Sequence, residues 1–175
     1  SLDALTVDGF VARVDQRLRP WGSAGQLAIP VVACEDYYEV HGREWERFAL
    51  LKARPVAGDR DLGTNLLDSL KPFMYRKYLD FGVFESIRDL KSKIETEVRR
   101  NGRDQNVKVG RGGIREIEFI VQSMQLLRGG QIPTLQVTGF LEALSALVDE
   151  SILTADDGRQ LREDYLWLRH VEHVI

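Results

Sequence analysis

The sequence contains very little cysteine and histidine. Of its 175 residues, one is a cysteine, Cys34, and three are histidines. A single cysteine cannot form an internal disulfide, and so small a set cannot build a zinc site from Cys and His. A chain of this length can bury a self-sufficient apolar core without such supports. We therefore expect a core held by packing alone, in a reducing, cytoplasmic setting.

Long apolar runs and an excess of positive charge are also missing. No stretch reaches the roughly 18 apolar residues of a membrane span, and the N-terminus lacks a signal-peptide pattern. Lys and Arg number 24 against 27 Asp and Glu, a net charge of -3. We therefore expect neither a membrane nor nucleic acid as a partner, because affinity for the phosphate backbone needs clustered positive charge. The charge balance also disfavours a third class, a helix-turn-helix nucleic-acid binder, which salt-sensitive retention on DNA would support.

The N-terminal region has the pattern of a β-strand. Apolar and charged residues alternate over residues 8–19 with a period of two. Pro20 ends this pattern, and a glycine-containing turn leads to a short apolar segment at residues 27–29. The pattern predicts a strand or a hairpin.

The rest of the sequence predicts helices, over residues 31–42, 44–52 and most of the chain from 64 onward. The segment 84–98 has one apolar stripe at helical spacing, whereas 114–128 is apolar on several sides and is expected to be central. Two more helices are expected, over 137–149 and from Thr154, whose hydroxyl could cap the amide of Asp157. The predicted fold class is mainly α, a helical bundle preceded by the strand or hairpin.

The last residues, 170–175, end in the middle of an apolar helical pattern without a cap or a helix breaker. We therefore expect the sequence to be a piece of a longer protein.

Asp15 is the first candidate for chemistry. On a strand it would share a face with Arg13, Arg17 and Arg19. One interpretation is a charged face in solvent. The other is a carboxylate that holds a divalent cation beside arginines that bind phosphate, as phosphoryl or nucleotidyl transfer requires. The residues alone leave both open.

The second candidate is the glycine-rich segment before the central helix. Gly110, Gly112 and Gly113 would let successive amide groups point at one anion, and the start of the helix would add its positive end. Lys108 and Arg115 would supply charge. The segment matches neither a Walker loop nor a dinucleotide fingerprint. A plain glycine-rich turn before a core helix is the open alternative.

Two acidic residues follow this segment. Glu116 and Glu118 are two residues apart in a helix, so they lie on nearly opposite faces and cannot act as one pair. In so apolar a helix, each needs a basic or metal partner or a place in solvent. The spacing of Asp59 and Asp61 favours a turn rather than a metal site.

Four segments carry a resemblance to a known family: residues 13–28, 35–59, 71–81 and above all 108–130, KVGRGGIREIEFIVQSMQLLRGG. They resemble the glutamine synthetase adenylyltransferase family, bifunctional enzymes that attach AMP to a tyrosine of glutamine synthetase and remove it. The likeness covers essentially the whole chain. The family has two nucleotidyltransferase domains of the polymerase-beta type, each followed by a helical bundle. The sequence GGIREIEFIVQ, with RGG after it, resembles that of the N-terminal, adenylyl-removing copy.

The resemblance implies a domain division and a set of site residues. Residues 1–30 would be the C-terminal part of a nucleotidyltransferase core, and 31–175 the helical bundle. Asp15 matches the third carboxylate of the family's metal site and would be catalytic. The residues that match segments implied to contact nucleotide or phosphate are Arg17, Arg19, Lys52, Arg54, Lys108, Gly112, Gly113, Arg115, Glu116 and Glu118. The family's strand with D-x-D, which supplies the other two carboxylates, is not found before Asp15.

The implied reaction is deadenylylation by phosphorolysis, in which phosphate attacks the phosphorus that joins AMP to the tyrosine and ADP is released. It implies Mg²⁺, with adenine nucleotide (ATP or ADP) and phosphate as substrates, and glutamine synthetase and the PII signalling protein as partners. With one of three carboxylates, this piece alone is expected to be inactive. The competing interpretation is a catalytically inert helical module that senses PII or glutamine.

Overall fold

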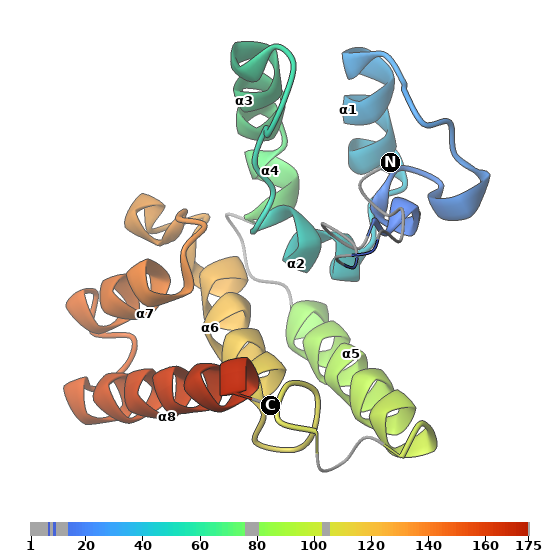
Figure 1. Ribbon diagram of the computed structural model, residues 1–175. Coiled ribbons are helices and arrows are strands. Elements are labelled where there is room, and N and C mark those ends of the chain that lie inside the picture. Colours follow the sequence, from blue (N-terminus) through green and yellow to red (C-terminus); the bar gives the residue numbers. More distant parts are fainter. Residues whose placement is uncertain (1–6, 8, 10–13, 76–80, 103–105, 175) are drawn as a thin grey trace. The chain divides into compact units, whose positions relative to one another are not determined.

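A computed structural model describes residues 7, 9, 14–75, 81–102 and 106–174, without the side chains of 81–84 and 86. The chain divides into two compact units, Ser1–Gly42 and Arg43–Ile175. Apart from an isolated β-bridge at Gly9, the described parts of both units are helices, short 3-10 turns and loops (Figure 1). None of the described helices combines the length and the apolar character needed to cross a membrane.

The first unit is built from two 3-10 turns, η1 (Gln16–Leu18) and η2 (Gly22–Ala24), and the helix α1 (Val31–Val40). Pro30 precedes α1, where its fixed backbone suits the start of a helix. The ring of Trp21 packs on the ring of Tyr37, with centroids 4.6 Å apart. This contact joins the 3-10 region to α1, so the first unit continues beyond residue 30.

The strand predicted for residues 8–19 is wrong over residues 14–19, and Gly9, the other described residue of this range, forms an isolated β-bridge. Residues 27–29 form no strand either. Asp15 accepts a hydrogen bond from the amide of Arg17, 3.0 Å away, and so caps the turn η1. Such a local bond competes with the pairing of a strand, which alternation of residue types does not reveal. Residues 8 and 10–13 lie outside the described residues. The remnant of a polymerase-beta-type core is therefore not confirmed.

The second unit is helical, which confirms the predicted class. Its elements are α2 (Glu44–Leu50), α3 (Arg60–Ser69), α4 (Lys71–Met74), α5 (Phe81–Arg100), α6 (Ile114–Arg128), η3 (Pro133–Leu135), α7 (Phe140–Asp149) and α8 (Ala155–Val174). Helix α3 begins before the predicted start at 64 because Asp59 caps it, accepting from the amide of Leu62 at 2.9 Å. The Asp59 carboxylate therefore has a structural role.

Helix α6 is central, as predicted, because it contacts α2, α7 and α8. One core cluster joins it to α7 and η3 through Val121, Leu135, Leu144 and Leu147. A second cluster lies against α2 and α4 and consists of Leu51, Met74, Tyr75 and Leu126. Packing on both sides fixes α6, and so fixes the position of the acidic residues in its first turns.

The buried amide of Gln125 reinforces this arrangement. Its Nε2 donates to the carbonyl oxygens of Leu135, at 2.8 Å, and Val137, at 2.9 Å. Before α8, the hydroxyl of Thr154 accepts from the amide of Asp157 at 3.1 Å, as predicted. Helix α8 therefore begins with a side-chain cap.

Candidate functional site

Asp15 lies in the first unit, and its carboxylate is held by one arginine. Arg17 donates from Nε to Oδ1 at 2.9 Å and from Nη2 to Oδ2 at 2.8 Å. These hydrogen bonds favour the charged carboxylate and lower its pKa to about 2. The pair is exposed to solvent, and the lowered pKa keeps the carboxylate ionised near neutral pH.

Asp15 does not make a magnesium site by itself. Both of its oxygens are engaged by Arg17, and the described residues contain no group of three acidic, His or Cys side chains that could hold a metal. Mg²⁺ needs more than one such oxygen, from carboxylates or from substrate phosphates. Asp15 could therefore contribute one carboxylate to such an ion only together with further ligands.

The side chain of Arg19 stabilises the conformation of the same loop. Its guanidinium donates to the carbonyl oxygens of Gln16, Ser23 and Gly25, the last at 3.0 Å from Nε. These bonds close the two 3-10 turns on each other. The Arg19 side chain is therefore committed to the backbone of its own loop.

In the second unit, Lys52 and Glu118 are brought together. Lys52 Nζ lies 2.9 Å from Glu118 Oε1, which ties the end of α2 to α6. Burial and the neighbouring Glu118 charge both raise the pKa of Tyr165, which is hydrogen bonded to Glu118. Arg54 follows in an exposed loop.

Glu116 has a different set of partners. Its Oε1 lies 2.9 Å from Lys91 Nζ on α5, and its Oε2 accepts from the amide of Gly112 at 2.7 Å. The bond from Lys91, followed by the one from Gly112, lowers the pKa of Glu116. The expectation that Glu116 and Glu118 each need a separate partner is confirmed.

The glycine-rich segment does not leave its amides free for an anion. The amide of Gly113 donates to Gly110 O at 3.0 Å, that of Ile114 to Val107 O at 3.1 Å, and that of Arg115 to Lys108 O at 2.9 Å. The backbone amides that were predicted to bind an anion therefore donate to carbonyl oxygens of the loop itself. Any anion bound here has to be held by side chains.

Two glycines of this loop are required by its shape. Gly112 has a φ of +72°, in the left-handed region. A Cβ on Gly113 would lie 2.6 Å from Val107 O and 2.9 Å from Gly110 O. Lys108, at the start of the loop, pairs with Glu172 of α8 at 3.1 Å. The loop is thus packed on itself and anchored at both ends.

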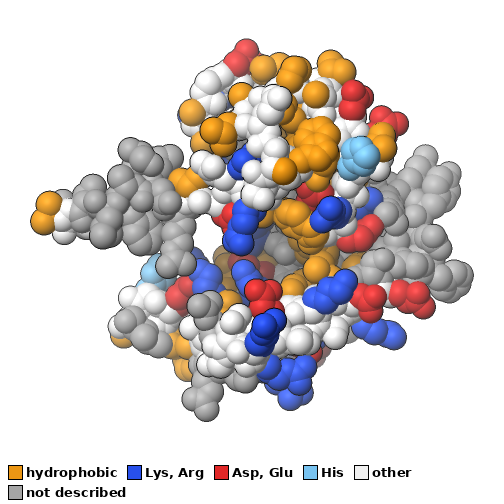
Figure 2. Space-filling model, turned by 90° about the vertical axis from the view of Figure 1, so that its right-hand side faces the viewer, with side chains coloured by type: hydrophobic (Ala, Val, Ile, Leu, Met, Phe, Trp, Pro, Cys, Tyr) orange, Lys and Arg blue, Asp and Glu red, His pale blue; other side chains and the backbone are white. Residues whose placement is uncertain are grey.

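A cleft of about 520 Å³ opens between α5, this loop and α6. Its charged lining residues are Lys91, Glu95, Arg99, Arg111, Arg115 and Glu116, and its apolar ones are Ile94, Val98, Val109 and Phe119. In Figure 2, Lys and Arg side chains gather on the lower part of the face shown, the height at which α5 and the loop lie in Figure 1. The volume falls within the range of small-molecule sites.

The cleft contains two of the predicted site residues, Arg115 and Glu116. Sequence reasoning missed Lys91 and Arg99 of α5 and Arg111 of the loop. A signal was present, since Lys91, Glu95 and Arg99 are spaced by four residues and so lie on one helix face. That this face turns toward the loop could not be read from spacing.

Two family models match parts of the chain. The model described as glutamate-ammonia ligase adenylyltransferase matches residues 1–69. The model described as GlnD PII-uridylyltransferase matches residues 88–175.

Curated relatives match over the whole chain. The bifunctional glutamine synthetase adenylyltransferase/adenylyl-removing enzyme of Hahella chejuensis is 56% identical over 175 residues, which are 100% of this chain and 18% of that protein. Enzymes of the same description from Pseudomonas putida and Pseudomonas aeruginosa are each 50% identical over the same span, again 18% of their length. The chain therefore spans about a fifth of the length of these relatives.

Proposed function

The chain belongs to the family of bifunctional glutamine synthetase adenylyltransferase/adenylyl-removing enzymes, and from this premise we propose that it is part of the half that removes AMP. In that reaction an oxygen of phosphate bonds to the phosphorus of AMP, and the bond from that phosphorus to the tyrosine oxygen of glutamine synthetase breaks. The tyrosine oxygen takes up a proton, and ADP is released. The observation that carries the proposal is the 56% identity over the complete chain. The assignment to the AMP-removing half rests on the amino-acid sequence of residues 112–122 and 128–130.

Within this proposal, Asp15 supplies one carboxylate to Mg²⁺, and the other ligands come from residues outside this chain. Arg17 holds the Asp15 carboxylate charged and turns to phosphate oxygens when nucleotide is bound, because a guanidinium binds either oxyanion in the same forked geometry. Arg19 contributes indirectly, by stabilising the conformation of the loop that holds Asp15 and Arg17.

In the second unit, Lys52, Arg54, Lys108 and Arg115 are the proposed contacts to nucleotide or phosphate. Gly112, Gly113, Glu116 and Glu118 act by fixing the loop and α6, as their contacts support. Glutamine synthetase is the proposed protein substrate, and PII the proposed regulator.

The first test uses the chain alone. We expect no ADP when the 175-residue chain is mixed with phosphate, magnesium and adenylylated glutamine synthetase, because a single carboxylate holds Mg²⁺ weakly. Release of ADP above the level without the chain, measured by chromatography, would refute this expectation.

The second candidate function is an inert module that senses PII or glutamine. It is supported by the ion pairs, which hold Lys52 and Lys108 within the bundle. Substituting Asp15→Asn in the full-length protein separates the two. Loss of deadenylylation with an unchanged response to PII supports the active-site role, and normal deadenylylation with an altered PII response supports the sensor.

A further inference from the structure

The cleft between α5 and α6 holds positive charge that the carboxylates of its described lining do not balance. Lys91 is held by Glu116 at 2.9 Å and lies 3.7 Å from Glu95. The described residues supply no ion pair to Arg99, Arg111 or Arg115, all of which line the cleft. With four cations and two carboxylates, the lining has a net charge of +2. The charge calls for an anionic occupant.

The same cleft has an apolar wall. Ile94 and Val98 continue the apolar stripe of α5, yet both are only half-buried, and they line the cleft together with Val109 and Phe119. The ring of Phe119 is held in place by stacking on Phe48, with centroids 4.9 Å apart and planes 5° from parallel. An occupant that covers this wall would complete the burial of the stripe.

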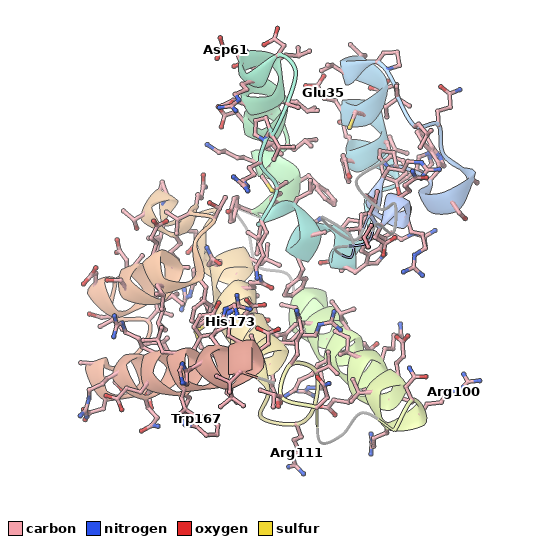
Figure 3. All side chains as sticks on the ribbon, viewed as in Figure 1. Glu35, Asp61, Arg100, Arg111, Trp167 and His173 are labelled. Atoms are coloured by element: carbon pink, nitrogen blue, oxygen red, sulfur yellow. The ribbon has the colours of Figure 1, made fainter. Side chains whose placement is uncertain are left out.

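The loop at the mouth of the cleft is fixed before any ligand arrives. Glu116 accepts from the amide of Gly112 and pairs with Lys91, so one carboxylate links the loop, α5 and α6. Arg111 lies at the outer edge of this loop, where its side chain extends away from the helices (Figure 3). A site braced in this way loses little further conformational freedom on binding.

We propose that this cleft binds a small organic phosphate. The phosphate lies between Arg99 and Arg115, with Arg111 closing over it from the rim, and an apolar or aromatic part lies against Val98, Val109 and Phe119. Guanidinium groups favour phosphate because they donate two parallel hydrogen bonds to its oxygens. The net charge of +2 on the lining is opposite in sign and similar in size to the charge of about −2 on a phosphate monoester near neutral pH. Lys91 and Glu116 are positioning residues.

This inference rests on the proposed function only in sharing Arg115 and Glu116. Its test requires binding and no turnover, so its failure would leave the deadenylylation proposal in place. Likewise, a failure of deadenylylation would not affect the binding result.

The experiment is titration calorimetry of the 175-residue chain at low ionic strength without divalent cations, with ADP, adenosine and inorganic phosphate as probes. ADP is expected to bind more tightly than either of its parts. Arg99→Gln and Arg115→Gln should each weaken ADP binding about tenfold, as expected for the loss of one charge-assisted contact. Arg111→Gln should have a smaller effect, because Arg111 lies at the rim.

Two control variants locate the site. Arg128→Gln, at the exposed end of α6 and outside the cleft, should bind ADP as the parent does. Arg162→Gln should also leave the affinity unchanged, because Arg162 is an exposed residue of α8, which contributes no residue to the cleft. Circular dichroism and the melting temperature report whether each variant is folded, and methyl NMR shifts of Val98 and Val109 report contact with the ligand.

The proposal is overturned if Arg99→Gln and Arg115→Gln bind ADP with the affinity of the parent. Adenosine or free phosphate binding as tightly as ADP would also contradict it, since the cleft would then select only one half of the proposed ligand. ADP binding that moves no Val98 or Val109 methyl signal would place the site elsewhere.

Discussion

At the scale of single residues, the acidic side chains of the candidate regions are defined by their cationic partners. Asp15 is held by Arg17, Glu116 by Lys91, and Glu118 by Lys52. Each of these pairs fixes a backbone turn or joins two elements. The charges that remain without such partners in the described cleft are those of arginines, and for this reason the cleft is assigned to an anion.

The pair of Asp15 and Arg17 gives a direct prediction. Replacing Arg17 by Gln removes the forked hydrogen bonds, so the pKa of Asp15 should rise from about 2 toward its ordinary value of 3.8. An NMR pH titration of the Asp15 carboxyl carbon measures the change. Glu172, whose partners are Lys108 and Arg169, should titrate unchanged in the same spectra. An Asp15 pKa that stays near 2 would show that Arg17 is not its cause.

At the scale of elements, helices α7 and α8 approach closely at a glycine. Gly158 is buried in the first turns of α8, and a Cβ added there would meet Cγ2 of Val148 on α7. In a free helix, Gly→Ala stabilises by roughly 1 kcal/mol. Overpacking costs about 1–3 kcal/mol, so the steric effect should win.

The substitution Gly158→Ala is therefore expected to lower the free energy of unfolding by about 1 kcal/mol, as measured by urea denaturation. In a Val148→Ala background the neighbouring methyl groups are gone, and the same substitution should raise stability instead. If Gly158→Ala stabilises the protein equally in both backgrounds, the close approach of α7 and α8 is not as described.

Most of the helices were predictable from the sequence, because apolar residues recur in them at helical spacing or a capping residue marks their start. Helix α1 begins and ends within the predicted range, and α8 starts at the predicted Thr154 cap. The turn η1 was not predictable, because the residues that form it, capped by Asp15, show the same alternation of residue types as a strand. An alternation of apolar and charged residues does not by itself show that a segment pairs with a second strand.

The candidate site could be predicted only in part. The need of Glu116 and Glu118 for separate partners followed from their spacing. The partners themselves are Lys91 of α5 and Lys52 of the turn after α2, and they could be found only from the packing of α5 and α2 near α6. The filling of the glycine loop by its own carbonyls depends on its full backbone path, which the glycines permit but do not specify.

At the scale of the whole molecule, the pKa shifts predict how stability depends on pH. The pKa values of Asp15, Glu116 and Glu172 are lowered by their cationic partners. A lowered carboxyl pKa contributes stability that is present above the unfolded value, near 4, and lost as pH falls below it. Burial raises the pKa of Tyr75 to about 12, which contributes stability that is lost as pH rises above about 10.

We therefore expect the urea midpoint of unfolding to stay level between about pH 5 and 9 and to fall on both sides. Glu116→Gln should flatten the acid limb, because this group then no longer titrates. Tyr75→Phe should flatten the alkaline limb in the same way. A midpoint that falls equally steeply in both variants would assign the pH dependence to other groups.

The most direct test of the central claim, that this chain belongs to the AMP-removing half, compares the two opposite reactions in one variant. In the full-length protein, Asp15→Asn should abolish phosphate-dependent release of ADP from adenylylated glutamine synthetase, while transfer of AMP from ATP to the unmodified synthetase continues at the parent's rate. Loss of the transfer reaction with normal release of ADP would contradict the account and place the chain in the other half.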